Sequence, residues 1–277
     1  MSRNEVSTGI GLRHVRVAER DTDGTIKVPS GTAHNVAYSG LRIEGANALA
    51  LAIPAPQRVS AQGDDRVYHT FTLPPTEVAS GDLRVSKTNM NVIALISGVK
   101  VFESPTMRAV GFGTDKQGLE PAVVLWGCRQ AIDSEGGSAY FGQQVWQTYY
   151  CPNAELNVQP ASMENAAVGE VVYNVTCNDA TKGHLGETFT TLLNGFTKAQ
   201  YLMIVTLNHL MIDAFTGDAV HRAFTLSQTP STGSVERCTV NGVINTAYTR
   251  VTTTVTFTTA PAASAKILFC YEYVATN

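Results

Sequence analysis

Residues 45–73, GANALALAIPAPQRVSAQGDDRVYHTFTL, contain two runs in which apolar side chains alternate with small or polar ones. The first run sets Leu49, Leu51 and Ile53 against Ala48, Ala50 and Ala52, and the second sets Val67, His69, Phe71 and Leu73 against Arg66, Tyr68, Thr70 and Thr72. An alternation with a period of two places the two sets on opposite faces of a strand. Gln62-Gly63-Asp64-Asp65, between the runs, is typical of a turn. We therefore predict a long β-hairpin in which the two runs pair, with one apolar face and one face of polar or small residues.

The segment that follows predicts a turn of the chain and then one short helix. Leu73-Pro74-Pro75 cannot continue a central strand, so we expect the hairpin to end there. Thr88 or Asn89 can cap a helix, and Gly98 can end it. The apolar positions at helical spacing are Met90, Ile93, Ala94 and either Ile96 or Ser97. The expected unit is a β-sandwich that carries one short α-helix.

Most of the remaining chain is also predicted to form strands. Residues rich in β-branched or aromatic side chains, bounded mostly by Gly, Pro, Asn or Asp, are 12–18, 107–112, 122–126, 168–177 and 249–258. After about Phe215 we expect further short strands over residues 223–226, 235–240, 252–258 and 266–274, with Asn241-Gly242 as a strong hairpin signal. The predicted fold class is mainly β. It combines a β-sandwich domain over residues 1–207 with a small all-β, immunoglobulin-like module over residues 208–277.

The composition argues against several classes of function. The chain has 277 residues, of which 44% are hydrophobic and only 16% are charged, against roughly 25% charged in a typical soluble domain. A net charge of −3 and a pI near 6.1 leave no basic excess for binding phosphates. We find no signal peptide and no apolar stretch long enough to cross a bilayer, so we expect synthesis in a cytosol. A surface poor in charge suits a protein that packs against copies of itself, and a secreted β protein with a neutral polar surface is the alternative.

Motifs of catalysis and metal binding are absent from the sequence. It contains no GxSxG, no HExxH and no Walker loop. The six histidines are widely spaced, and His69, on the apolar face of a predicted strand, is interpreted as a core histidine. The five cysteines, which form no CxxC pair, are Cys128, Cys151, Cys177, Cys238 and Cys270. We expect them to be reduced and half-buried in strands, and we predict no catalytic residue, no metal ligand and no cofactor.

Two other classes of function stay open at this point. Trp126, Trp146, Tyr149 and Tyr150 are able to form a sugar-stacking platform, as in a carbohydrate-binding protein or a surface adhesin, although packing in the core is the commoner fate of such residues. A β-fold glycosidase would need two carboxylates facing each other in a cleft. Sequence spacing does not identify such a pair among the 23 acidic residues.

The order of these features resembles that of the major tail proteins, or tail tube proteins, of siphophages. The matching stretches are Gly45-Ala46-Asn47-Ala48-Leu49, Gly63-Asp64-Asp65, Leu73-Pro74-Pro75-Thr76-Glu77, the helix ending at Gly98, Gly111-Phe112-Gly113-Thr114-Asp115-Lys116-Gln117-Gly118 and Val123-Val124-Leu125-Trp126-Gly127. They resemble, in turn, that family's hairpin start, turn, Pro-Pro break, short helix, Gly-bounded turn and aromatic strand. The resemblance covers residues 40–190, and the C-terminal part is similar to small β modules appended to virion proteins. This chain differs in a longer segment before the helix, residues 80–87, and in Arg66 beside the two aspartates.

The resemblance implies a structural virion protein of a bacteriophage, made in the host cytoplasm. Six copies are expected to form a homohexameric ring, and stacked rings are expected to form the tail tube through which DNA is ejected. The implied partners are other copies of the chain, the tape-measure protein, the tail-tip and tail-terminator proteins, and DNA only in transit; no membrane is implied. The residues expected to face the lumen are Asp64, Asp65, Arg66, Tyr68, Thr70 and Thr72.

Overall fold

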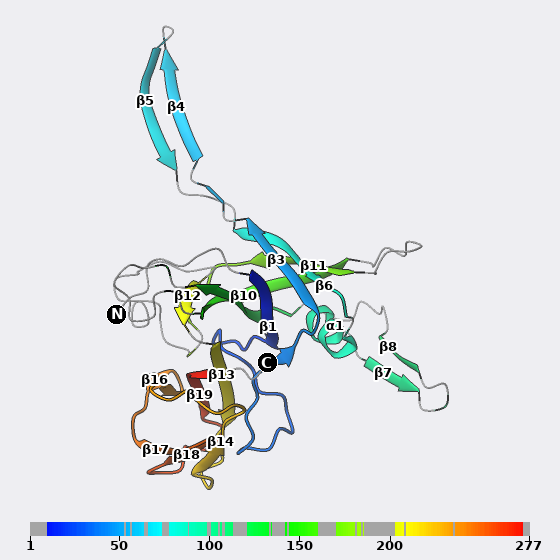
Figure 1. The fold of residues 1–277 in the computed structure, drawn as a ribbon, viewed down its shortest axis with the longest axis vertical. Coiled ribbons are helices and arrows are strands. Elements are labelled where there is room, and N and C mark those ends of the chain that lie inside the picture. The colour runs from blue at the N-terminus through cyan, green and yellow to red at the C-terminus, as the bar shows by residue number, and fades with distance from the viewer. Residues whose placement is uncertain are drawn as a thin grey trace.

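The structure, a computed structural model, is mainly β, as predicted. It describes residues 10–52, 54–55, 57–63, 66–73, 78–87, 89–98, 101–104, 106, 109–112, 121–132, 134, 142, 144–159, 170–180, 182–183, 185, 203–207, 209–234 and 236–273. Within these ranges, strands form several antiparallel sheets around one α-helix. Figure 1 shows a body of stacked sheets from which one thin ribbon projects far outward.

The body is built on an eight-stranded antiparallel sheet. Its order is β2 (Leu41–Arg42), β1 (Ile10–Glu19), β9 (Val123–Ile132), β10 (Gln144–Gln159), β11 (Val171–Cys177), β6 (Ala79–Val85) and β3 (Ala46–Ala52), and β12 (Met203–Leu207) pairs with β10 beside β11. Only Ile43, Glu44 and Gly45 connect β2, at one edge, to β3, at the other. The sheet must therefore curl until its two edges approach, and β1 and β3 are indeed in contact. Its inner face buries one core, in which Val17, Leu83 and Leu125 are inaccessible to solvent or nearly so.

Helix α1 (Met90–Ser97) packs against this core. The Asn89 side chain caps it by accepting a hydrogen bond from the Asn91 N–H at 3.0 Å, and Gly98 ends it with φ 64°. Only a residue without a Cβ adopts that left-handed conformation at little cost. Val92, Ile93 and Ile96 are the buried residues. The predicted helix and both of its ends are confirmed, and the buried face includes Val92, which was not predicted.

The C-terminal strands form a sandwich of two small sheets. One sheet has the order β13 (His209–Thr216), β19 (Lys266–Tyr273), β15 (Arg237–Val240) and β16 (Val243–Ile244), and the other β14 (Ala223–Thr225), β18 (Thr254–Phe257) and β17 (Tyr248–Val251). Phe215, Phe224 and Phe269 lie fully buried between them. Seven strands in two layers agree with the expected small all-β module.

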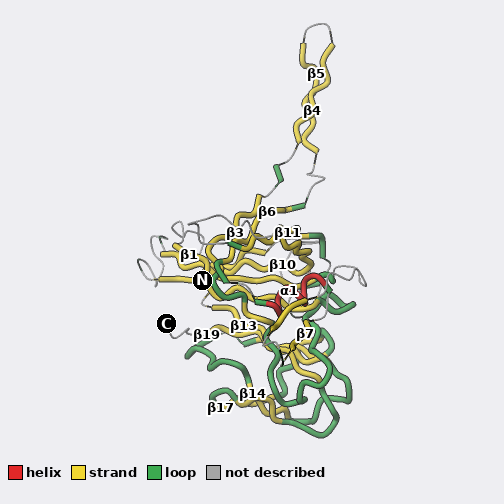
Figure 2. Tube along the Cα trace, turned by 90° about the vertical axis from the view of Figure 1, so that its right-hand side faces the viewer, coloured by secondary structure: helices red, strands yellow, loops and turns green. Residues whose placement is uncertain are grey.

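The module lies against the outer face of the large sheet, as Figure 2 shows. Trp126 and Tyr150, from β9 and β10, pack there on Ile212 and Leu268, from β13 and β19. Both faces of β13 and β19 are thus covered, which explains why their sequences are nearly continuous apolar runs without alternation. The chain passes from the large sheet to the module between β12 and β13, near the predicted boundary at residue 207. Residues before that boundary also line the module, because the backbones of Tyr38 and Ala214 exchange hydrogen bonds of 3.0 and 2.9 Å.

The pairing of the long hairpin differs from the prediction. Strand β3 pairs with β6, and β4 (Gln57–Gly63) pairs with β5 (Arg66–Leu73). Residues 48–52 therefore do not pair with residues 66–73. The hairpin does end at Leu73, before Pro74-Pro75, as predicted, and β6 is a separate strand that follows. Both runs do alternate, but alternation alone does not define which strand is the partner.

A second correction concerns residues 249–258, predicted as one continuous run, whereas the strand expected over 252–258 corresponds to β18. The chain turns at Thr252, where φ is 51°, so that β17 and β18 form a hairpin. A turn of threonines carries none of the usual Gly, Asn or Pro signals. The Asn241-Gly242 turn, by contrast, is confirmed between β15 and β16, with φ of 53° and 77°. The remaining described pair is a separate hairpin of β7 (Val101–Ser104) and β8 (Ala109–Phe112).

Candidate functional site: a projecting arm and a cationic cleft

Strands β4 and β5 form an arm that leaves the body. Gln57 pairs with Leu73 at its base and Gly63 with Arg66 at its far end. An eight-residue strand extends about 27 Å at roughly 3.4 Å per residue. Among the described elements, β4 and β5 make extensive contacts only with each other, and Figure 1 shows the ribbon standing clear of both sheets and the helix. An isolated two-stranded hairpin is at best marginally stable in water. The arm is therefore the element of this fold that most needs a surface outside its own chain.

The arm also holds the residues predicted to face a lumen. Arg66, Tyr68, Thr70 and Thr72 occupy alternate positions of β5, which is a strand as expected. Asp64 and Asp65 lie outside the described residues, and in sequence they connect the terminal pair Gly63 and Arg66. His69 lies in β5 as well, and its side chain, expected in the core, lies outside the described part of the structure. Exposure of these residues to a channel stays a prediction.

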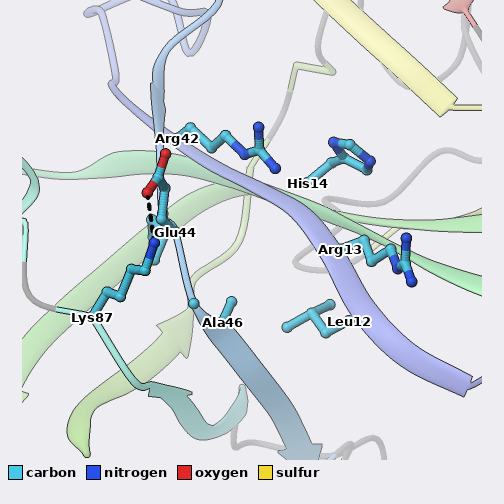
Figure 3. Close-up of a pocket in the computed structure, with 9 residues that line it drawn as sticks. Leu12, Arg13, His14, Arg42, Glu44, Ala46 and Lys87 are labelled. Atoms are coloured by element: carbon cyan, nitrogen blue, oxygen red, sulfur yellow. Dashed lines mark hydrogen bonds and ion pairs between the residues drawn. The ribbon is translucent and has the colours of Figure 1, made fainter. Parts of the chain in front are cut away.

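A cleft of about 430 Å³ lies at the other side of the body. Strand β1 contributes Leu12, Arg13 and His14; β2 and the connection to β3 contribute Arg42, Ile43, Glu44, Gly45 and Ala46; and Lys87 follows β6. In Figure 3 the side chains of Arg42, His14 and Arg13 flank β1, while Glu44 and Lys87 face each other across the connection. The backbone of this rim is tied together where the Ser86 N–H donates to the Gly45 carbonyl at 2.8 Å.

The cleft is cationic. Arg13, Arg42 and Lys87 are exposed, and the one carboxylate lining it, Glu44, accepts from Lys87 at 3.3 Å. His14 adds no charge at neutral pH, because burial, and after it the nearby Arg42, Arg16 and Arg13, lower its pKa to about 4. The guanidinium groups of Arg13 and Arg42 each present several donors suited to a carboxylate or phosphate. The cleft is thus suited to an anionic group.

Backbone geometry at His14 shapes the cleft. The pairing of β1 with β9 is irregular between Arg13 and Arg16, and His14 within this bulge has φ 54°. A bulge redirects side chains relative to a regular strand. Here the His14 ring lies 6.2 Å from the rings of both Trp146 and Tyr273, each edge-on. The bulge thus anchors one wall of the cleft on the large sheet and on the last strand of the module.

The arm and the cleft lie at opposite ends of one ribbon. Strand β3 begins at Ala46, which lines the cleft, and ends at Ala52, on the side of the arm. Its partner β6 begins at Ala79, opposite Cys177, and ends at Val85, two residues before Lys87. Figure 1 shows β3 running from beside α1 toward the arm. The molecule is therefore polar along this direction, with a projection at one end and a cationic hollow at the other.

A charged cluster fixes the module to the body. The Lys266 ammonium, on β19, contacts Asp21 and also donates to Asp23 Oδ2 at 2.9 Å and Thr25 Oγ1 at 3.0 Å. Burial alone would raise the pKa of both carboxyls. Their hydrogen bonds, including those to Lys266, outweigh it, so both pKa values are lowered. The two acids share one lysine, so this pair forms an ionic joint between the N-terminal loop and the module.

The aromatic residues weighed as a sugar platform do not form one. Trp126 and Tyr150 are buried between the large sheet and the module, 1% and 0% exposed, as core packing predicts. Trp146 and Tyr149 are half-buried and three residues apart on β10, and the regular pairing there places them on opposite faces. The Tyr149 ring is covered by the Arg129 guanidinium at 5.3 Å.

The five cysteines are free, as expected, and are buried more fully than the expected half-buried state. Cys151 and Cys177 lie next to each other, with their sulfur atoms 2.8 Å apart. No group of three or more His, Cys, Asp or Glu suited to a metal ion occurs in the part of the chain that the structure describes. In the same part, none of the helices has the length and apolarity needed to span a membrane.

Sequence reasoning did not identify the cleft. Arg13, Arg42 and Lys87 lie far apart in the chain and belong to no motif. Their juxtaposition depends on the curling of the sheet, which brings the strand edges β2 and β3 together. The basic run Arg13-His14-Val15-Arg16 was the only local signal, and a short basic run on a strand is common on protein surfaces. Comparisons with known proteins add no identification, since no protein-family model and no curated protein matches the sequence.

Proposed function

We propose that this chain is a non-enzymatic structural subunit that polymerises into the tail tube of a bacteriophage, as stacked homohexameric rings. The observation that supports this most is the arm. It extends the β3–β6 ribbon of a well-packed body into solvent, and no described element of the same chain supports it. A second copy is the natural source of the missing surface, because a polymer supplies the same surface to every arm.

The low charge of the chain supports the same proposal. A subunit in a tube buries a large part of its surface against its neighbours, and each buried charge would need a partner. With 16% charged residues, this chain has few such charges to satisfy. A lumen bordered by Tyr68, Thr70 and Thr72, with Arg66 as the one cation among the residues expected there, would hold DNA weakly, since tight binding needs clustered Lys or Arg. The tape-measure, tail-tip and terminator proteins are the further partners that this role entails.

The proposal makes the C-terminal module an integral part of the subunit. Notably, β13 and β19 pack on the outer face of the large sheet through a shared core, and Lys266 ties the two parts together. The module then decorates the outside of the tube in a fixed position. We keep the surface adhesin as the alternative outcome of the test, because discrete oligomers without tubes would favour it.

The test is electron microscopy of the purified chain over a concentration series, with sedimentation velocity on the same samples. We expect hollow filaments of uniform width, whose mass grows with concentration above a threshold. The measurement is repeated with the tape-measure and tail-tip proteins added, since these nucleate growth in such a polymer. Monomers or small closed oligomers under every one of these conditions would contradict the proposal.

A further inference from the structure

We infer that the far end of the arm, Asp64-Asp65, docks in the cationic cleft of the next copy of the chain. This inference rests on the proposed self-assembly and adds to it the pair of surfaces that joins successive copies. The occupant of the cleft is then the acidic Asp64-Asp65 segment of a second copy.

Charge complementarity is the first argument. The cleft presents Arg13, Arg42 and Lys87 against one carboxylate, Glu44. The sequence of the arm's end shows the inverse pattern, with Asp64 and Asp65 beside one cation, Arg66. Each guanidinium can bind a carboxylate with two parallel hydrogen bonds. Lys87 remains able to share its ammonium, because the exposed Glu44–Lys87 pair is worth little on its own.

The second argument is position. The arm and the cleft lie at opposite ends of the β3–β6 ribbon, so the end of one copy's arm can reach another copy's cleft only head to tail. A contact between two different patches of the same molecule is heterologous, and it repeats indefinitely unless rotation closes it into a ring. A tube that grows by stacking requires an open contact of this kind along its axis.

The third argument is the size and shape of the cleft. At about 430 Å³ it lies within the range of roughly 300–1,000 Å³ found for pockets that hold small ligands, so it accommodates a tight turn but excludes a broad surface. Leu12, Gly45 and Ala46 also line it and carry no side-chain charge, so the cations are the groups available to an acidic ligand. In this arrangement one face of β5 borders the channel, and the turn residues leave the channel to enter the neighbouring cleft.

The test uses two full-length variants, each altered at one end of the contact. Asp64→Lys/Asp65→Lys reverses the charge at the end of the arm and leaves the cleft intact. Arg13→Glu/Arg42→Glu reverses the charge of the cleft and leaves the arm intact. We expect each variant alone to stop at monomers or single rings, with the mass of tubes at least tenfold below wild type in sedimentation. A 1:1 mixture should grow again by alternation, since the Asp arm of one variant matches the Arg cleft of the other and the Lys arm matches the Glu cleft. A chain carrying all four changes should likewise form tubes.

The control is Arg222→Glu, which reverses an exposed arginine on the module away from the cleft, and it should assemble as wild type. Far-UV circular dichroism and thermal midpoints verify that each variant is folded. If wild type forms tubes and either single-end variant forms them equally well, the docking inference is overturned while the proposed function stands. If wild type forms no assembly under any condition, there is no second copy to dock and both proposals fall.

Discussion

The arm β4–β5 and the strand pair β13–β19 are two antiparallel pairs of similar length that differ in what surrounds them. Strands β13 and β19 pair over eight residues, and each of their faces is buried in a core. The arm has a comparable ladder of backbone hydrogen bonds but makes extensive contacts with no other described element. Backbone pairing alone gives little net stability, and apolar burial supplies most of it. The comparison teaches that the β13–β19 pair is stabilised by cores within its own chain, whereas the arm depends on a neighbour.

The largest effect on stability is expected in the module core. Phe269 is fully buried, and its ring lies 5.1 Å from Tyr248 and 6.3 Å from Phe257. Truncation of a buried phenylalanine typically costs about 3–5 kcal/mol. We expect Phe269→Ala to lower the free energy of unfolding by that amount, measured by chemical denaturation. Val243→Ala, at a position 70% exposed, is the matched control and should change it by less than about 0.5 kcal/mol. Equal effects of the two changes would contradict the account of the core.

A smaller effect is expected at the ionic joint. Lys266→Met removes the ammonium shared by Asp21 and Asp23, which are partly buried, and leaves two neighbouring carboxylates without their cation. We expect a loss of about 1–2 kcal/mol and faster amide exchange in residues 21–27. Lys87→Met breaks the exposed pair with Glu44 and should cost less than about 0.5 kcal/mol. If Lys266→Met and Lys87→Met lowered the free energy of unfolding equally, the cluster around Lys266 would not hold the module.

The pH dependence tests the surroundings of His14. Its pKa is about 4 in the folded chain, against about 6.5 in the unfolded chain. Between these values the unfolded chain binds a proton that the folded chain does not, so stability falls as the pH drops from 7 toward 4. The charged groups responsible are Arg13 and Arg16 on β1 and Arg42 on β2. We expect His14→Asn, which tolerates the left-handed backbone, to flatten the stability profile between pH 7 and 5. An unchanged slope would exclude His14 as its source.

The smallest effect on stability is expected from removing the arm. Replacing residues 57–73 with a short Gly-Ser linker deletes both strands and the turn. These strands make extensive contacts with no other described element. The deletion should therefore change the free energy of unfolding of the body by less than about 0.5 kcal/mol, and its thermal midpoint only slightly. Assembly should nevertheless be lost completely. A large drop in the midpoint would mean that the arm supports its own body and would remove the basis of the proposed function.

Local patterns in the sequence predicted much of the fold. The helix over residues 90–97 and the Asn241-Gly242 hairpin were predictable because caps and tight turns depend on residues close in sequence. The partner of β3 was not, since alternation defines a face but not a neighbour. Strands β13 and β19 show no alternation because both of their faces are covered, which only the packed layers reveal. The cleft is lined by residues as distant in the chain as Arg13 and Lys87, and its chemistry was accordingly missed.

The most direct test of the central claim is amide hydrogen exchange of residues 57–73, measured by mass spectrometry over a series of protein concentrations. The account predicts that these amides exchange rapidly in the dilute monomer and become protected as the chain associates, while β13 and β19 stay protected throughout. Protection of the arm that is already complete in the monomer, or that never changes with concentration, would contradict the claim that a second copy supports it.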